Sequence, residues 1–459
     1  MVLKKKKKRN ILDNSNVGVR GEDKLSNLPD ALIHHILSFL PTKCAMSTCI
    51  LSKRWKHVSN SIQILDFRKW RTQKGTIVFF GKEEKLETWC FMNFVDTVLF
   101  LHQRRDIQKF YLDLDELFDE SRVNKWISTI MNSKVEEFGL SIKLLSFYSE
   151  FRPSIFCSDS FSICHSLTLL DLNFHRITDA NKFNIANTVS FPKLKILRLK
   201  LLIFVNETLT RFISNCPILE ELSLTQCRIS EGLCIVKPAL KHLSVTDCGL
   251  SKSTVKISAP NLLTISFKEC PPADFVLDSF PSLVEADVGF YMHKGDKYQN
   301  RVFVKLFEKL SSAKLLKIYA NSFKVLREVD ILLTDLIAFN NLIHLEIGLP
   351  LDYKSFGTDS ISTSTEIPSV QNDDWSLDPN CSPPHLKSIK FKKFDGEQKE
   401  LNAVRFFLKY FGFLETVTIV ASESLSKDHK KQLTLAKLLL KIPRPANCVV
   451  NFLSISEDP

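Results

Sequence analysis

The sequence contains no long hydrophobic segment. Among its 459 residues, even the longest apolar runs, such as Leu201–Val205, have only the length of a strand. A membrane-spanning helix needs roughly 18–20 apolar residues. No hydrophobic region follows the basic run Lys4–Arg9, as a secretory signal would require. We therefore expect neither a membrane span nor secretion.

Paired cysteines are also missing. None of the twelve cysteines forms a CxxC pair or another paired spacing typical of metal ligands. In a chain of this length without a secretory signal, scattered cysteines are typical of reduced core residues in the cytosol or nucleus. The sequence thus predicts neither a disulfide framework nor a metal site.

The motifs of common catalytic and nucleotide-binding sites are absent as well. The sequence has no GxSxG, no P-loop, no GxGxxG and no HExxH. The acidic run from Asp113 to Glu120 lacks the glycine and the spacing of a calcium loop. Such a run is more typical of a solvated helix start. We expect no catalytic residue and no cofactor.

The positive charge is concentrated near one end of the sequence. The formal net charge is +11, and Lys4–Arg9 contributes six of these charges, which leaves +5 for the rest. The basic run fits either a nuclear import signal or a solvated disordered tail. Basic residues are not interleaved with aromatic ones on one face, which disfavours nucleic-acid binding. We expect the protein in the nucleus and cytoplasm.

Residues 25–58 have the pattern of three short helices. Pro29 favours the first turn of a helix, and apolar residues then recur at helical spacing until Pro41. A second helix is predicted around Lys43–Cys49, followed by a third that carries Trp55. A unit of about forty residues is near the lower limit for independent folding. Its apolar stripe is wider than so small a core needs, which favours a partner on that surface.

The rest of the chain repeats the apolar pattern L-x-x-L-x-L. Successive copies begin 21 to 44 residues apart, and most intervals are close to the roughly 20–29 residues of a leucine-rich repeat. The last two positions of each copy lie on one face of a short strand, so stacked copies would form a parallel sheet around one core. Cys227, Cys248 and Cys270 follow three of these strands and are predicted to be buried. The twelve copies begin at Ile107, Val135, Leu167, Leu194, Leu219, Leu240, Leu262, Leu283, Leu315, Leu342, Leu386 and Leu414.

Strand residues that alternate with the core positions should face the inner surface of this solenoid. They are polar and mixed in charge, which suits a protein-binding face better than an active site. For each residue taken alone, an ordinary solvated position is an equally good interpretation. The candidate target-binding residues are Asp171, Asn173, Arg198, Lys200, Thr225, Thr246 and Lys268.

Residues 25–58 resemble the F-box. The resemblance rests on the segments Leu28–Asp30, Ile36–Lys43 and Leu51–Trp55, although Cys44 stands where the family usually has a small acidic residue. It implies docking onto a Skp-type adaptor and, through the adaptor, onto a cullin-based ubiquitin ligase. Carried over by position, it implies adaptor contacts at Leu28, Pro29, Ile33, Leu37, Leu40, Pro41 and Leu51, with Trp55 partly core and partly contact.

The body resembles plant F-box/leucine-rich-repeat proteins that carry a C-terminal FBD domain. The segment after the F-box predicts a helix over residues 88–102, and its apolar stripe would include Trp89, Met92, Val95, Val98 and Leu99. The FBD resemblance rests on Trp375, Pro384–Ile389, Phe394–Gly396, Glu400–Leu401, Val404–Leu408 and Leu414–Ile419. It implies strand, glycine turn, helix and strand. A helix through Leu433–Leu440 and a strand at Cys448–Leu453 would close the end, and capping the solenoid is the expected role.

The expected fold class is therefore α/β, with an N-terminal three-helix F-box followed by an irregular leucine-rich-repeat solenoid and a C-terminal FBD cap. The segment 351–374 is rich in Ser, Thr and Asp and is expected to be a flexible loop. The expected parts are a basic tail (1–21), the F-box (22–60), the solenoid (61–350), this loop, and the FBD with the C-terminal cap (375–459).

The resemblance implies a non-catalytic substrate-recognition subunit of a Skp–cullin–F-box ubiquitin ligase. The F-box would bind the adaptor, and the repeats would bind a target protein. The alternative is an interaction scaffold that binds the adaptor without promoting ubiquitination. A membrane partner is not expected, and the sequence does not name the target.

Overall fold

The chain was analysed as a computed structural model. It divides into a helical unit that ends at Ile62 and a sheet unit that begins at Gln63. The basic tail and the segment 351–374 lie outside the residues that the structure describes, as does Trp375. The described residues are 28–68, 82–102, 107–115, 118–143, 165–175, 182–183, 189–290, 300–319, 339–348 and 385–454.

The helical unit contains the three helices predicted from the sequence. They are α1 (Asp30–Ser38), α2 (Thr42–Ser47) and α3 (Lys53–Ser59), with a 3-10 turn η1 (Thr48–Ile50) before α3. Pro29 and Pro41 directly precede α1 and α2, where the missing proline N–H costs no helical hydrogen bond. Ser52 caps α3, because its Oγ accepts a hydrogen bond of 3.2 Å from the Trp55 amide.

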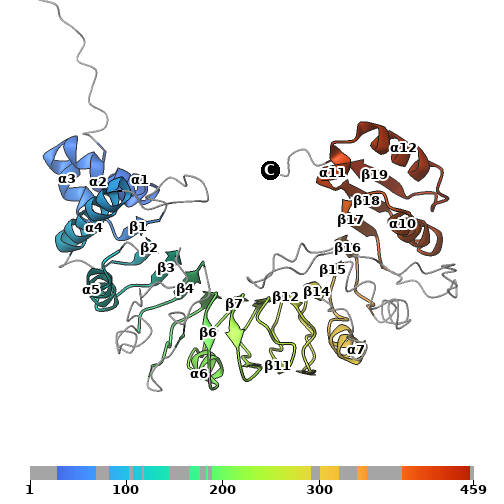
Figure 1. Cartoon of the computed structure of the whole chain (residues 1–459), viewed down its shortest axis with the longest axis horizontal. Helices are drawn as coiled ribbons and strands as arrows, with labels where there is room; N and C mark the ends of the chain where they lie inside the picture. Colours follow the sequence, from blue (N-terminus) through green and yellow to red (C-terminus); the bar gives the residue numbers. More distant parts are fainter. Residues whose placement is uncertain are drawn as a thin grey trace, which may run out of the picture. The chain divides into compact units, whose positions relative to one another are not determined.

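The sheet unit is built on one parallel sheet of fourteen strands, which pair in the order of the sequence (Figure 1). Successive strands pair in register, as the solenoid prediction requires, with one shift in register between β17 and β18. The strands are β1 (Ile64–Phe67), β2 (Lys109–Asp115), β3 (Glu137–Lys143), β4 (Leu169–Phe174), β5 (Ile196–Lys200), β7 (Glu221–Thr225), β10 (His242–Thr246), β12 (Thr264–Glu269), β14 (Glu285–Phe290), β15 (Leu315–Tyr319), β16 (His344–Gly348), β17 (Ser388–Phe394), β18 (Thr416–Ala421) and β19 (Val449–Leu453).

The predicted apolar frame forms the core of this sheet. In β7, for example, Leu222 and Leu224 are fully buried, and Leu219 is buried just before the strand. One frame was placed wrongly. Leu315 is only half-buried, and the core positions of β15 are Leu316 and Ile318. A further frame was missed at Ile62, Leu65 and Phe67, which are all buried at β1.

The long strands line one side of the core. The helices and short strands that connect them lie on the other side. Figure 1 shows α5, α6 and α7 on that side, with β11 between α6 and α7. β9, β11 and β13 form a small parallel sheet, and β6 pairs with β8. These elements are α5 (Glu120–Met131), β6 (Ile203–Phe204), α6 (Thr208–Ser214), β8 (Arg228–Ile229), β9 (Leu233–Val236), β11 (Thr254–Ser258), β13 (Asp274–Leu277) and α7 (Asn300–Lys309).

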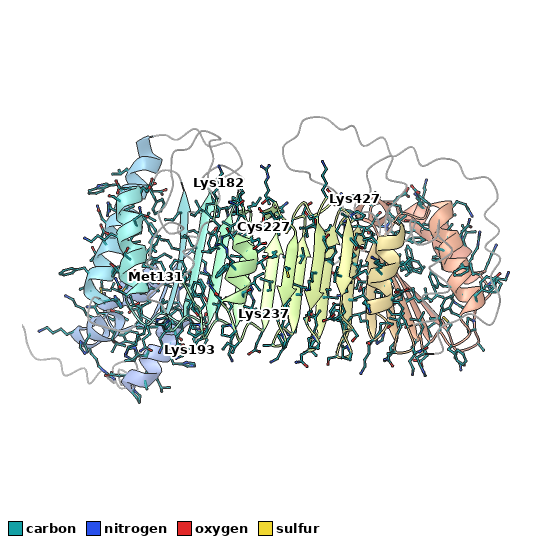
Figure 2. The ribbon with its side chains drawn as sticks, turned by 90° about the horizontal axis from the view of Figure 1, so that it is seen from below. Met131, Lys182, Lys193, Cys227, Lys237 and Lys427 are labelled. Atoms are coloured by element: carbon teal, nitrogen blue, oxygen red, sulfur yellow. The ribbon has the colours of Figure 1, made fainter. Side chains whose placement is uncertain are left out.

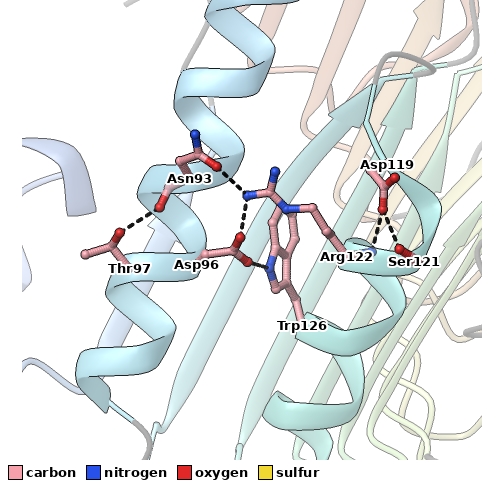
Figure 3. Close-up of polar contacts among 7 residues, drawn as sticks. All are labelled: Asn93, Asp96, Thr97, Asp119, Ser121, Arg122 and Trp126. Carbon is pink, nitrogen blue, oxygen red and sulfur yellow. Dashed lines mark hydrogen bonds and ion pairs between the residues drawn. The ribbon is translucent and has the colours of Figure 1, made fainter.

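A long helix, α4 (Lys82–His102), lies beside α5 and is held there by polar contacts (Figure 3). The Asp96 carboxylate accepts hydrogen bonds from the Arg122 guanidinium and, at 2.5 Å, from Trp126 Nε1. The predicted stripe of α4 was right at four positions and wrong at Trp89. That side chain is 59% exposed. The core-facing side of the helix is defined by the buried residues Thr88, Met92 and Val95, and Trp89, one residue after Thr88, points away from that side.

Tight turns follow the carboxyl ends of several strands. Leu201, Gln226 and Asp247 have positive φ angles of 57°, 54° and 59°, a conformation that is uncommon for residues other than glycine. Cys227 and Cys248, which come directly after two of these turns, are buried as predicted. In Figure 2, Cys227 lies at the opposite edge of the sheet from Lys193 and Lys237, which precede strands.

The end of β12 differs, because its last residue, Glu269, is buried and the predicted Cys270 is not. Cys270 is only half-buried, whereas Glu269 is 1% exposed. The carboxylate of Glu269 accepts hydrogen bonds from the backbone amides of Cys248, Leu250 and Gly249. Burial raises the pKa of Glu269 to about 7, although these amide hydrogen bonds act in the opposite direction.

The C-terminal part has the predicted order of strand, glycine turn, helix and strand. After β17, Gly396 has a φ of 76°, and the Glu400 carboxylate accepts from the amides of Asp395 (3.0 Å) and Glu397 (2.9 Å). Asp395 in turn accepts from the hydroxyls of Ser422 and Ser424. The matched FBD residues therefore fix a turn. The helices here are α10 (Gln398–Tyr410), α11 (Glu423–Ser426) and α12 (His429–Leu440).

We predict that Glu269 makes stability depend on pH. The ordinary carboxyl pKa is 4.5 and the folded one is about 7, so between these values the folded state holds a proton that the unfolded state has released. The free energy of unfolding should then fall as pH rises through this window, by on the order of 3 kcal/mol. Urea unfolding at pH 5 and pH 8 measures this change.

Glu269→Gln is the matched variant, because the amide keeps an oxygen acceptor for the turn and cannot titrate. Its free energy of unfolding should change less between pH 5 and pH 8 than that of the native chain. Glu400, whose pKa burial also raises to about 7, contributes equally to both proteins and cancels in the comparison. Identical pH profiles for the two proteins would contradict the assignment.

Candidate functional site: two candidate binding surfaces

The helical unit closes a small core of its own. Ile33 and Leu37 of α1 pack there with Ala45, Trp55 and Val58, and all five are buried. Arg54 of α3 fixes the entry to α1, because its guanidinium donates to the Leu28 carbonyl and to the Asp30 carboxylate. The small core leaves the remaining apolar residues of the unit on its surface.

These remaining residues form the first candidate surface, which we call the apolar patch. Leu32, Ile36 and Phe39 are spaced four and three residues apart and so share one side of α1. The most exposed members are Phe39 (73%), Ile50 (85%) and Leu51 (57%). The patch consists of Leu32, Ile36, Phe39, Leu40, Ile50 and Leu51.

The predicted adaptor residues divide between this surface and the core. Leu28 is half-buried, and Pro29, Leu40, Pro41 and Leu51 are exposed. The other three predicted contacts, Ile33, Leu37 and Trp55, lie in the core of the unit. The patch adds Leu32, Ile36, Phe39 and Ile50, which the sequence did not single out as contacts. The sequence feature that pointed to such additional contacts was the unusual width of the apolar stripe.

The second candidate surface is the inner side of the sheet, where strand residues alternate with the core. The seven predicted target-binding residues come together there on five neighbouring strands, β4, β5, β7, β10 and β12. Asp171 and Arg198 are register partners in one row. Asn173, Lys200, Thr225, Thr246 and Lys268 follow one another in the adjacent row.

Ion pairs between strands neutralise part of this surface. Arg198 Nε lies 2.8 Å from Glu221 Oε1, and Lys268 Nζ lies 2.7 Å from Asp287 Oδ2. Between these pairs the first row carries only hydroxyls, since Ser223, Ser244 and Ser266 are register partners. The middle of the surface is therefore small, polar and uncharged, with a charged pair on each side.

An aromatic ring packed over a glycine occurs twice on the same side of the sheet. Tyr111 lies over Gly139, where an added Cβ would collide with the ring, and Tyr319 lies over Gly348. A cation also lies over each ring. The guanidinium carbon of Arg68 is 4.2 Å from the centre of the Tyr111 ring, and Lys268 Nζ is 5.0 Å from the centre of the Tyr319 ring. The sequence did not show these pairs, because the partners are 28 and 29 residues apart.

At the carboxyl ends of β3 to β5 the inner surface becomes more basic. Lys143, His175 and Lys200 gather there, and His175 Nε2 lies 3.0 Å from Ser141 Oγ. Burial lowers the pKa of His175, and the two lysines lower it further. Nearby, burial raises the pKa of Asp171 against the opposing effect of Arg198.

Two inner-face oxygens have no hydrogen-bond partner in the described part of the chain. They are Asn173 Oδ1 and Asp287 Oδ1, both inaccessible to solvent. Leaving a buried acceptor unpaired usually costs about 1–3 kcal/mol. Both residues belong to the two inner rows, but their buried oxygens are not accessible to a bound segment.

The described residues show neither a metal cluster nor a membrane helix. No group of three or more His, Cys, Asp or Glu side chains among them is arranged to hold a metal ion. None of their helices has the length and apolar character to cross a membrane.

Comparisons with known proteins agree with this organisation. Residues 25–67 match the family model of the F-box domain, and residues 374–419 match that of the FBD. Residues 123–275 match a family described as the LRR repeats of the FBD-associated F-box protein At5g56370. These matches support a substrate-adaptor role in general, with a Skp-type adaptor on the F-box and a target protein on the repeats. Proteins of this kind are typically non-catalytic adaptors.

Two relatives are named as F-box/LRR-repeat proteins. The F-box/LRR-repeat protein At4g14103 of Arabidopsis thaliana is 30% identical over 344 residues, which cover 71% of this chain and 84% of the relative. The F-box/LRR-repeat protein At3g59190 of the same organism is 31% identical over 293 residues, covering 62% and 71%. The chain belongs to the plant F-box/LRR-repeat family, in the group that also carries an FBD domain.

Proposed function

We propose that this protein is the substrate-recognition subunit of a Skp–cullin–F-box ubiquitin ligase. The observation that carries the proposal is the apolar patch of the helical unit. Phe39, Ile50 and Leu51 are exposed although the core of the unit is already closed without them. Exposed apolar side chains gathered on a unit this small mark a protein-interaction surface.

In this proposal the patch docks on the Skp-type adaptor, together with the exposed predicted contacts Pro29 and Pro41 and the half-buried Leu28. The buried residues Ile33, Leu37 and Trp55 support the patch by positioning α1 against α3. The adaptor would in turn connect the chain to a cullin. The chain itself supplies proximity between a target and the ubiquitin-charged enzyme, which raises the effective concentration of the reacting groups.

The target is proposed to bind the two inner rows between β4 and β12. The support is their mixture of hydroxyls and charged pairs, such as Thr246 and the Lys268–Asp287 pair. A nuclear and cytoplasmic location, suggested by the basic run Lys4–Arg9, completes the proposal.

The first prediction concerns the adaptor. Phe39→Asp combined with Leu51→Asp should abolish adaptor binding, since truncation of a central apolar anchor typically costs on the order of 2 kcal/mol, or roughly thirtyfold in Kd. Phe413→Asp is the matched control, because Phe413 is equally exposed but belongs to the sheet unit. Co-purification of the adaptor with each full-length variant measures the effect.

Both variants should keep the native thermal midpoint, since neither position lies in a core. Retention of the adaptor by the double variant at native affinity would remove the apolar patch from the proposal. Loss of the adaptor by the Phe413 variant would mean that the contact lies elsewhere.

The second prediction separates the proposal from the scaffold alternative. The full chain carrying Phe39→Asp and Leu51→Asp should still capture the proteins that the native chain captures when the proteasome is blocked, but it should no longer promote their ubiquitination. The reason is that capture is assigned to the inner rows and coupling to the apolar patch. Affinity purification with ubiquitin-remnant mass spectrometry measures both.

If the native chain captures the adaptor and a partner but never promotes ubiquitination of that partner in a reconstituted reaction, the scaffold alternative is correct. If the double variant promotes ubiquitination as the native chain does, coupling does not run through the patch.

A further inference from the structure

The last strand of the sheet, β19, leaves one edge open. β19 pairs with β18 alone, and no described strand covers its other edge (Figure 1). Val449 is 54% exposed and Leu453 50%. Val450 and Phe452 occupy the core-facing positions of β19, yet they are only half-buried. Their register partners in β18, Val417 and Ile419, are fully buried. The core is thus not closed at this edge.

The open edge presents unpaired backbone groups. The Val449 amide donates to the Glu415 carbonyl at 2.9 Å, so Val449 directs its backbone groups towards β18. In a strand these directions alternate from residue to residue. The N–H and C=O groups of Val450 and Phe452 therefore point away from the sheet and are available to a further strand.

β19 lacks the features by which proteins usually protect a free edge. Such edges generally carry charged residues, a proline or a bulge, which prevent another strand from pairing. Residues 449–453 read Val-Val-Asn-Phe-Leu and contain neither a charge nor a proline. Their pairing with β18 is also continuous in register. The strand is therefore ready to accept a neighbour.

The helix and the loop that precede β19 are rich in basic residues. α12 contacts β19, and Arg444 is close enough for its charge to lower the pKa of the Cys448 thiol, which burial raises. Five basic side chains of α12 and the following loop are exposed and have no ion-pair partner in the described part of the chain: Lys430, Lys431, Lys437, Lys441 and Arg444.

We propose that the β19 edge is a docking site for an extended segment of a partner protein, which adds a fifteenth strand to the sheet. The segment would carry small apolar side chains at alternate positions, to cover Val450 and Phe452, and acidic residues on its flanks, to meet Lys441 and Arg444. Strand addition of this kind takes its affinity from main-chain hydrogen bonds and its specificity from side chains. This gives the C-terminal region a binding role that is separate from the inner rows.

The charge decides against a second copy as the occupant. Pairing two β19 edges would bring two α12 helices with their basic residues together, and like charges at short distance repel. An acidic partner segment is attracted by the same residues. Self-association through β19 is accordingly an outcome that would overturn the proposal.

Three fluorescent peptides test the site on the full-length chain. Each has a core of alternating Val and Thr, flanked in the first by Asp-Glu pairs and in the second by Lys-Lys pairs, and the third has acidic flanks and two prolines in the core. Anisotropy should show the acidic-flanked peptide binding at least about tenfold more tightly than the lysine-flanked one, with a difference that shrinks at high salt. The proline peptide should not bind, because it cannot form the ladder.

Variants of the chain complete the test. Val450→Pro removes an outward amide and should abolish binding. Lys441→Glu with Arg444→Glu should weaken binding of the acidic-flanked peptide by about tenfold, whereas Lys193→Glu, at an exposed position before β5, should have no effect. If Val450→Pro strongly lowers the thermal midpoint, its loss of binding could come from unfolding. The test of the site then rests on the charge-reversal variant alone.

Three results would overturn the proposal: no binding of the acidic-flanked peptide, equal binding of all three peptides, or native affinity in the charge-reversal variant. A dimer in sedimentation that Val450→Pro dissociates would also overturn it, since a second copy would then occupy the edge. None of these results bears on adaptor binding, so this site can fail while the proposed function stands.

Discussion

The alternation of core and surface residues along each short parallel strand is the constraint on which the rest of this structure depends. Leu222 pairs with Leu243 in the next strand and with Leu197 in the previous one, so that one-residue slippage would turn both sets of side chains to the wrong face. The intervals between strands are free to vary, from 21 residues between Leu219 and Leu240 to 45 between Ile62 and Ile107. Only the register between strands must be kept, and the connecting segments differ in length from repeat to repeat.

The same alternation produces the candidate binding surface. Because every second strand residue is excluded from the core, the inner rows carry side chains that packing does not determine, such as Lys200 and Thr246. Their chemistry can change without loss of the fold.

The surface of the helical unit arises in a different way. It closes its core with Ile33 and Leu37 and leaves Ile36 and Phe39 outside, so its surface is apolar because its core is small.

The sequence was sufficient for the repeat, the order of the parts and most core residues, because the apolar frame is long and regular. It failed where two frames fit equally well. Around β15, residues 313, 316 and 318 and residues 315, 318 and 320 are all apolar, and only pairing of Leu316 with Ala286 and Leu345 decides between them. The buried Glu269 and the tyrosine–glycine pairs could not be predicted, because they depend on contacts between different repeats.

For the candidate sites, the sequence predicted which segments carry the surfaces but not which side of α1 is exposed. A stripe that contains Leu32, Ile33, Ile36 and Leu37 gives no sign of which two face the core. The target-binding residues were easier, since period-two alternation places them on the inner side once the strand is known.

Hydrogen–deuterium exchange of the full-length chain, with and without a purified Skp-type adaptor, tests the central claim most directly. The claim is that the apolar patch receives the adaptor and the inner rows remain free for a target. The account predicts slower exchange across residues 30–51 on adding the adaptor, with the amides of β4 to β12 unchanged. Unchanged exchange in residues 30–51, or new protection confined to β4 to β12, would contradict it.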